Sequence, residues 1–464
     1  TDAAYYFWLE VGQPVEGSID AEHIELDVDE LPPEAKLQVV LFGFDGELVL
    51  TKGQDVGELI LQPDGQVQVA TRVAEPNGVD EELLGRRLFF PIQTPSDDGT
   101  YRLRCNIYYE QTLLQSRLVT AKVMADPEPE KGVKALETAV DFVISKSLSG
   151  SHVTKMSPTR LSMMINDNGN DTHGFRFFGQ DNFKNDTFLD AGELQNLLDL
   201  ARGALRKAAW GEEEEYNGQA YLYTSGLDIG RLKVDLIRCA IRGYRFYDVV
   251  INRLAGDADK AWDLADLMLK PGQVQIASKQ SARLVMPAAM IYDYPLDTGL
   301  KGPYFKLCPE FEKNLKAGTP LETTACFKGE CPSYGHDDTV CPSGFWGYRH
   351  AIGMPVTIPN APDAPVELKI GAAPEISMAV STDPAFVGRQ EHEQRVKGLA
   401  PNLKFNYADE RPEAMDLMKK TSPHVLYFFC HGRVAADTPS IIVGPPDTRG
   451  IARDNLRNSR IRWR

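Results

Sequence analysis

The fold of this chain is decided by residues 424–432, which read His-Val-Leu-Tyr-Phe-Phe-Cys-His-Gly. The five consecutive apolar residues from Val425 to Phe429 are too few for a helix core and predict a strand buried on both faces. His431 follows the carboxyl end of that strand, where open α/β sheets form their ligand crevice. These residues alone leave open the alternative that His431 only ends the strand and Gly432 turns the chain.

The residues around this strand alternate between strand and helix patterns. Further strands are predicted at 374–382 and 403–407, and helices at 388–399 and 412–420. Strands and helices that alternate at this spacing form a parallel sheet with right-handed crossovers. Strand patterns at 273–276 and 284–291 come earlier in the chain, so residues 271–464 are predicted to form an α/β domain.

The first 125 residues predict an all-β unit. Short alternating runs are separated by turns, and Pro63-Asp64-Gly65 is a hairpin signal between two of them. The motif Asp97-x-Gly99-x-Tyr101-x-Leu103 resembles the tyrosine corner of immunoglobulin-like sandwiches, with Leu103 where antibody domains carry a cysteine. Residues 1–125 are therefore expected to form an Ig-like β-sandwich. Such a domain would bind a partner or act as a spacer between domains, and it would not catalyse a reaction.

A helical region is predicted between these two parts. Residues 126–130 are polar and interrupted by proline, so they are expected to be a linker. Apolar residues fall on one helical face over 133–144, a strand pattern follows at 174–178, and helical patterns cover 191–209 and 228–254. Residues 131–270 are therefore expected to be a helical, α+β region.

Length and composition limit the classes of protein to which the chain can belong. The 464 residues are enough for two or three domains, each with its own core. Lys and Arg total 50 against 66 Asp and Glu, and this net charge of −16 argues against nucleic acid or a membrane surface as a main partner. No apolar run approaches the ~18 residues that span a bilayer, and the first residues lack signal-peptide features. We therefore expect a cytoplasmic protein.

Four segments carry a resemblance to a known family. They are Ile-Ala-Ser at 276–278, Met-Pro-Ala-Ala-Met-Ile-Tyr-Asp at 286–293, Cys-Pro-Ser-Gly-Phe-Trp-Gly-Tyr-Arg-His at 341–350 and Phe-Cys-His-Gly at 429–432. In this order they resemble the landmarks of CHAT domains, the bacterial caspase-like (clan CD) cysteine proteases related to caspases, metacaspases and separase. The resemblance covers residues 131–464, and these four segments are its landmarks.

The resemblance implies a caspase-hemoglobinase fold and a cysteine endopeptidase that cleaves protein substrates through a Cys-His dyad without a catalytic cofactor. His431 matches the catalytic histidine, and Gly432 matches the residue whose backbone N–H helps to form the oxyanion hole. A thiolate nucleophile needs a neighbouring imidazole, and a glycine lets the backbone approach a developing oxyanion. CHAT-like proteins are often coupled to antiviral or stress circuits. We expect the Ig-like domain to dock a substrate, an activator or a regulatory protein.

One feature departs from the family pattern. The nucleophilic cysteine of the family closes the next core strand, whereas no cysteine follows His431 in the remaining 464 − 431 = 33 residues. Cys430 is a poor substitute, because adjacent strand residues point to opposite faces. We expect the nucleophile to lie outside this chain, which leaves the domain at 271–464 incomplete and the chain inactive alone. Two alternatives are a catalytically inactive scaffold for protein binding and one product of an autoprocessed zymogen.

Four of the seven cysteines fall in one loop-rich segment, at Cys308, Cys326, Cys331 and Cys341. Four thiols can hold a zinc ion that staples an irregular insertion, although the spacing is looser than in paired C-x2-C motifs. Free thiols, packed thiols or an oxidised pair are the alternatives. Any metal here is expected to be structural.

Arg349 and His350 are expected to have a structural role rather than to line a substrate cleft. His173 and His392 are predicted to be isolated on polar faces, because no partner pattern accompanies them.

Overall fold

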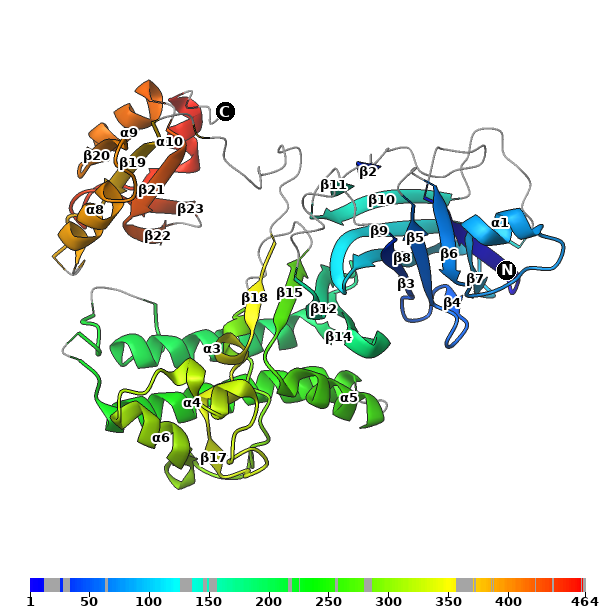
Figure 1. Cartoon of the computed structure of the whole chain (residues 1–464), viewed down its shortest axis with the longest axis horizontal. Helices are drawn as coiled ribbons and strands as arrows, with labels where there is room; N and C mark the ends of the chain where they lie inside the picture. The colour runs from blue at the N-terminus through cyan, green and yellow to red at the C-terminus, as the bar shows by residue number, and fades with distance from the viewer. Residues whose placement is uncertain are drawn as a thin grey trace. The chain divides into compact units, whose positions relative to one another are not determined.

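The computed structural model describes residues 1–11, 26–27, 34–62, 66–125, 136–144, 148–149, 157–215, 219–224, 226–254, 258–278, 286–355, 370, 373–384, 386, 388–421, 423–435, 438–459 and 461. The chain divides into two compact units, Thr1–Asp363 and Ala364–Arg464 (Figure 1). No helix in these described ranges has the length and apolarity to cross a bilayer.

Two β-sheets at the start of the first unit share one core. A three-stranded sheet has the order β1 (Ala4–Leu9), β7 (Leu88–Gln93), β4 (Val49–Leu50). A six-stranded sheet has the order β10 (Leu136–Val143), β9 (Thr112–Val123), β8 (Gly99–Tyr109), β3 (Ala35–Phe42), β5 (Val56–Leu61), β6 (Val67–Thr71). Leu88 and Phe90 of one sheet pack with Leu41 and Leu103 of the other, because alternate residues of each strand face inward. A short helix, α1 (Glu81–Arg86), precedes β7, and β2 (Leu26–Asp27) pairs with β11 (Leu148–Ser149).

The local geometry of this sandwich agrees with the tyrosine-corner motif. The Tyr101 hydroxyl donates to the Asp97 carbonyl at 3.0 Å, and Leu103 is fully buried. Strands β5 and β6 pair antiparallel around the expected hairpin, whose turn at 63–65 lies outside the described residues. The Ig-like assignment of the sandwich stays a prediction.

The helix predicted over residues 133–144 is wrong. Leu136–Val143 is strand β10, which pairs antiparallel with β9 and has a bulge between Val140 and Phe142. The apolar spacing in this segment fits either periodicity, but Thr138, Val140 and Val143 are β-branched and favour a strand beside an available edge. The expected linker at 126–130 lies outside the described residues.

A five-stranded mixed sheet follows in the first unit. Its order is β14 (Lys184–Asp190), β13 (Thr172–Gly179), β12 (Thr159–Asp167), β15 (Gln273–Ser278), β18 (Ala351–Gly353). The predicted strands at 174–178 and 273–276 and the predicted helices at 191–209 and 228–254 are confirmed. The helices are α3 (Ala191–Trp210), α4 (Ile229–Leu254) and α5 (Ala258–Leu269).

The mixed sheet lies between the helices and the sandwich. Met163 and Ile165 of β12 pack with the helices, whereas Met164 faces Tyr108 and Leu113 of the sandwich. Figure 1 shows α3, α4 and α5 on the side of this sheet away from β8 and β9. Strand β15 pairs in parallel with β12, so the expected division at residue 271 falls inside the first compact unit.

Residues 286–350 form short turns and helices rather than a regular layer. The strand predicted at 284–291 is wrong where it is described, because Ala288–Met290 is a 3-10 turn (η3). This part also contains η4 (Gly302–Tyr304), β16 (Lys306–Leu307), α6 (Pro309–Lys316), η5 (Leu321–Thr323), η6 (Cys326–Lys328), β17 (Thr339–Val340), η7 (Pro342–Gly344) and α7 (Trp346–Arg349). Prolines at the first position of α6 and η7 fit the unpaired N–H at a helix start.

The second unit contains the predicted parallel sheet. Its order is β20 (Lys404–Ala408), β19 (Glu375–Val380), β21 (Val425–Phe429), and all pairings are parallel. The predicted helices are α8 (Arg389–Lys397) and α9 (Arg411–Lys420). A second sheet of β22 (His431–Ala435), β23 (Thr438–Ile442) and β24 (Ile451–Ala452) follows and leads to α10 (Arg453–Asn458).

One expectation about β21 is corrected. The strand is only partly buried, and Val425 is 37% exposed. The reason is its position, because β21 pairs with β19 and is an edge strand of the sheet in the described part of the chain. Helix α9 packs with Leu426 and Phe428 on one face, and α8 contacts Tyr427 and Phe429 on the other.

Candidate functional site

The site forms at the carboxyl ends of two adjacent parallel strands. Asp383 follows β19, His431 follows β21, and His431 Nε2 lies 2.9 Å from Asp383 Oδ2. The side chains of His431 and Asp383 are 20% and 14% exposed, so both groups are half-buried. His431 therefore lies where its place after a parallel strand predicts.

The backbone that carries Asp383 is held on both sides. Ser381 N–H donates to the Phe429 carbonyl at 2.9 Å, and Thr382 N–H donates to the Gly444 carbonyl at 2.8 Å. The Ser381 hydroxyl donates to the same Gly444 carbonyl at 3.1 Å and accepts from Asp383 N–H at 3.2 Å. These bonds fix the carboxylate relative to the strand that carries the histidine.

Aromatic side chains surround the histidine. The Phe386 ring meets the His431 ring edge-on at 4.3 Å between centroids, and it meets Phe429 in the same way at 4.9 Å. His392 was expected to have no partner, and this is wrong. Its ring stacks on Phe429 at 4.7 Å, and its Nε2 lies 2.5 Å from the Tyr427 hydroxyl. The contacts arise because α8 crosses the same face of β21, which residue spacing did not reveal.

Gly432 and Cys430 flank the histidine in different environments. Gly432 is exposed, and a Cβ built on it has no heavy atom within 4 Å. Cys430 is half-buried against the core formed by α9 and the sheet, and burial raises the pKa of its thiol. A raised pKa disfavours the thiolate, so this environment agrees with the expectation that Cys430 is not the nucleophile.

A second candidate site is the cysteine cluster of the first unit. Cys308, Cys326, Cys331 and Cys341 are all buried, and their four sulfur atoms lie within 4.8 Å of one another. Cys308 Sγ lies 3.9 Å from both Cys326 Sγ and Cys331 Sγ. Sulfur atoms bound tetrahedrally at ~2.3 Å from zinc are separated by about 3.8 Å. The four cysteines can therefore hold a metal ion.

Two serine hydroxyls donate to sulfur atoms of this cluster. The Ser333 hydroxyl donates to Cys308 Sγ at 3.3 Å, and the Ser343 hydroxyl donates to Cys341 Sγ at 3.1 Å. Hydrogen bonds from the other cysteines, Cys326 first, hold the pKa of the Cys308 thiol well below its usual range, and the same contacts with Cys308 raise the pKa of the Cys326 and Cys341 thiols. Hydroxyl donors to the sulfur atoms are the outer contacts that orient metal ligands.

Arg349 and His350 are buried, as expected of structural residues. Arg349 pairs with Asp293, and its Nε donates to the Met268 carbonyl at 3.0 Å. Burial, followed by the charge of Arg349, lowers the pKa of His350 to about 3. A neutral imidazole in this position contributes to packing near Trp346, whose ring lies 6.1 Å away.

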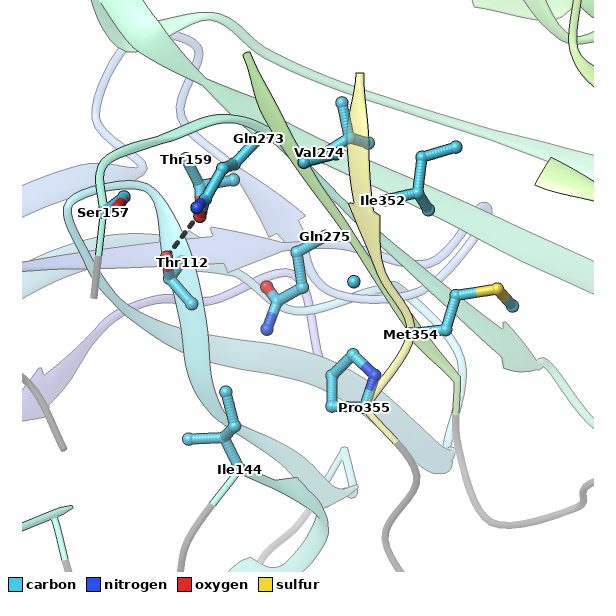
Figure 2. Close-up of a pocket in the computed structure, with 12 residues that line it drawn as sticks. Thr112, Ile144, Ser157, Thr159, Gln273, Val274, Gln275, Ile352, Met354 and Pro355 are labelled. Carbon is cyan, nitrogen blue, oxygen red and sulfur yellow. Dashed lines mark hydrogen bonds between the residues drawn. The ribbon is translucent and has the colours of Figure 1, made fainter. Parts of the chain in front are cut away.

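A cavity of about 570 Å³ lies beside the edge of the mixed sheet (Figure 2). Its described lining contains apolar and neutral polar residues, and three of the polar ones, Thr112, Thr159 and Gln275, bond to protein groups. Thr112 and Thr159 lie 2.6 Å apart, and the Gln275 amide bridges Leu113 N–H and Leu113 C=O of the sandwich. The geometry indicates that Gln275 joins the two sheets.

Sequence reasoning missed Asp383 and Phe386. The one available signal was the position of Asp383, directly after the parallel strand predicted at 374–382, by the same rule that selected His431. An acidic residue after a strand is common, so this signal alone does not separate it from others in a chain with 66 acidic residues.

Comparison with known proteins gives one informative relative. The chain is 41% identical over 476 aligned residues to a protein of Vitiosangium sp. named a probable protease. The alignment covers 100% of this chain and 61% of the relative, so the chain spans about three fifths of that protein. No family model matches the chain. No solved structure matches it either.

Proposed function

We propose that this chain carries the histidine half of a caspase-like cysteine endopeptidase of the CHAT type. The observation that carries the proposal is the half-buried His431 at the carboxyl end of β21, in a chain 41% identical to a probable protease. His431 is the general base, and the N–H of Gly432 is one oxyanion donor. The open space beside Gly432 is compatible with close approach of a substrate carbonyl.

The nucleophilic cysteine is proposed to come from sequence outside this chain. The edge position of β21 supports this part of the proposal, because within the described residues β21 pairs only with β19, and the backbone of an edge strand can pair with a further strand. A parallel strand beside β21 ends on the same side as His431, so a cysteine at its carboxyl end would meet the imidazole.

Peptide cleavage by the full-length protein tests this function. A peptide library prepared from a bacterial proteome serves as substrate, and mass spectrometry counts the new peptide ends. We expect cleavage that iodoacetamide blocks and that His431→Ala abolishes without a change in folding. The exposed His336→Gln variant is the matched control and should keep full activity. Cleavage retained in His431→Ala rejects the assignment.

A catalytically inactive scaffold that binds proteins is the second candidate. The observation that favours it is that Cys430, beside the histidine in the chain, is packed into the core with a raised pKa. An uncleaved peptide library with intact full-length protein supports the scaffold.

We also propose a structural zinc ion in the cysteine cluster. The proposal is supported by four buried sulfur atoms within 4.8 Å of one another. The ion would be bound by Cys308, Cys326, Cys331 and Cys341. It would stabilise a segment with little regular structure by cross-linking it. The N-terminal sandwich is proposed to dock a protein substrate, an activator or a regulatory protein.

A further inference from the structure

We propose that Asp383 is a positioning residue that holds the His431 imidazole in one tautomer and one orientation for proton transfer. The inference rests on the proposed function and extends a dyad to three groups. Its basis is the 2.9 Å contact between Asp383 Oδ2 and His431 Nε2, made by side chains that are 14% and 20% exposed.

The carboxylate is fixed before any substrate arrives. Asp383 lies in a segment whose backbone is bonded to the end of β21 through Ser381 and to Gly444 through Thr382. Its own N–H donates to the Ser381 hydroxyl. A group that acts through geometry needs this kind of support, because its partner must be held to within about 0.5 Å.

The other side of the histidine is fixed by packing. The Phe386 ring meets it edge-on at 4.3 Å, only three residues after Asp383 in the chain. One short segment after β19 therefore supplies both a polar and an apolar restraint on the same imidazole. A surface ion pair between flexible side chains has no such restraints and contributes little to stability.

The role of Asp383 follows from the position of each proton during the reaction. A neutral His431 donates Nε2–H to the Asp383 carboxylate, which leaves the lone pair on Nδ1 to accept a proton. Nδ1 takes the S–H proton of the nucleophile, which gives a thiolate and an imidazolium, and it later returns that proton to the leaving amine. Asp383 stays ionised and stabilises the imidazolium, as the carboxylate does in serine-protease triads.

The tautomer can be tested without any protease assay. In the 464-residue chain with ¹⁵N-labelled histidine, NMR should detect one ring protonated at Nε2 that disappears in His431→Ala. Asp383→Asn should shift the proton to Nδ1, because the amide group can donate to Nε2. The matched control Asp416→Asn, which breaks an exposed pair with Lys420, should leave this signal unchanged. An unchanged signal in both Asp383→Asn and Asp383→Ala overturns the inference.

The functional consequence is tested in the full-length protein with iodoacetamide as the probe. The thiolate displaces iodide, and peptide mass spectrometry measures the rate at each cysteine. We expect one fast cysteine outside residues 1–464, slowed on the order of 10²-fold by His431→Ala and by Asp383→Asn. Circular dichroism and urea unfolding confirm that each variant is folded.

Different results would reject the proposed protease function and the positioning role of Asp383. If His431→Ala leaves every cysteine at its original rate, the proposed protease function is rejected. If His431→Ala slows the fast cysteine but folded Asp383→Asn and Asp383→Ala do not, only the positioning role is rejected. An Asp383→Glu variant that keeps part of the rate lost in Asp383→Asn supports the role, because a glutamate carboxylate can still accept the Nε2–H hydrogen bond, whereas the longer side chain holds the ring less well.

Discussion

Asp293 and Arg349 form an ion pair with side-chain exposures of only 5% and 0%. Asp293 Oδ2 also accepts from Trp346 Nε1 at 3.0 Å, and Arg349 donates to the Ser343 and Met268 carbonyls. The pair joins the landmark at 286–293 to the landmark at 341–350. These two landmarks therefore meet in a buried polar contact of the first unit.

Removing the Arg349 side chain should strongly destabilise the first unit. Arg349→Met leaves the Asp293 carboxylate buried without its counter-charge, and we expect a loss of about 3–5 kcal/mol in the free energy of unfolding. Urea unfolding measures it. The matched control is Lys306→Met, which breaks a pair with Asp338 whose side chains are 69% and 34% exposed. Lys306→Met should lower the free energy of unfolding by less than about 1 kcal/mol. Equal losses in the two variants contradict the prediction.

His350 should make stability depend on pH. Its pKa is lowered to about 3 in the fold, against about 6.5 when unfolded, so the unfolded chain binds the extra proton first. The contribution of His350 to stability is therefore fully present above pH 6.5 and is lost on acidification, by at most about 1.4 kcal/mol per pH unit. Urea unfolding between pH 7 and 5 should give a flatter profile for His350→Asn. An identical slope in wild type and variant excludes the effect, and His336→Gln serves as the exposed control.

Gly243 marks a close contact between α4 and the turn at 288–290. A Cβ added to Gly243 would lie 1.9 Å from the Met290 carbonyl oxygen. Gly243→Ala should therefore destabilise the chain by about 1–3 kcal/mol or more, through overpacking. Gly85 is also helical, in α1, but its added Cβ meets nothing within 4 Å. Gly85→Ala should be neutral or slightly stabilising, and thermal unfolding of the two variants compares them directly.

The cysteine cluster should bind one zinc ion per chain. Elemental analysis of protein purified under reducing conditions measures the content, and a strong chelator should lower the unfolding temperature. Cys326→Ser should lose the metal. Cys105→Ala, which changes a buried cysteine in the sandwich outside the cluster, should retain it. A metal-free wild-type protein with four reactive thiols would refute the zinc proposal.

The aromatic contact of α8 with β21 should contribute to the stability of the second unit. Tyr427→Phe removes only the hydroxyl that lies 2.5 Å from His392 Nε2, and it should cost about 1 kcal/mol. His392→Ala should cost more, because it also removes the stacking on Phe429, a contact of about 0.5–1.5 kcal/mol. Urea unfolding that ranks the two variants in the opposite order is incompatible with this contact.

The sequence by itself determined the local elements of the second unit. Apolar runs bounded by helical stretches predicted β19, β20 and β21 as parallel strands, and the pairings agree. It failed at 133–144 and at 286–291, where periodicity fits more than one structure and the neighbouring strand or turn decides.

The sequence also selected His431 and the four cysteines, because their residue types and spacing are unusual. Only the tertiary structure decided what surrounds them. It brought Asp383 to His431 across 48 residues and gathered thiols separated by as many as 33 positions. Such contacts depend on strand order and loop path, which are set by burial of the whole chain and leave no local pattern in the residues that meet.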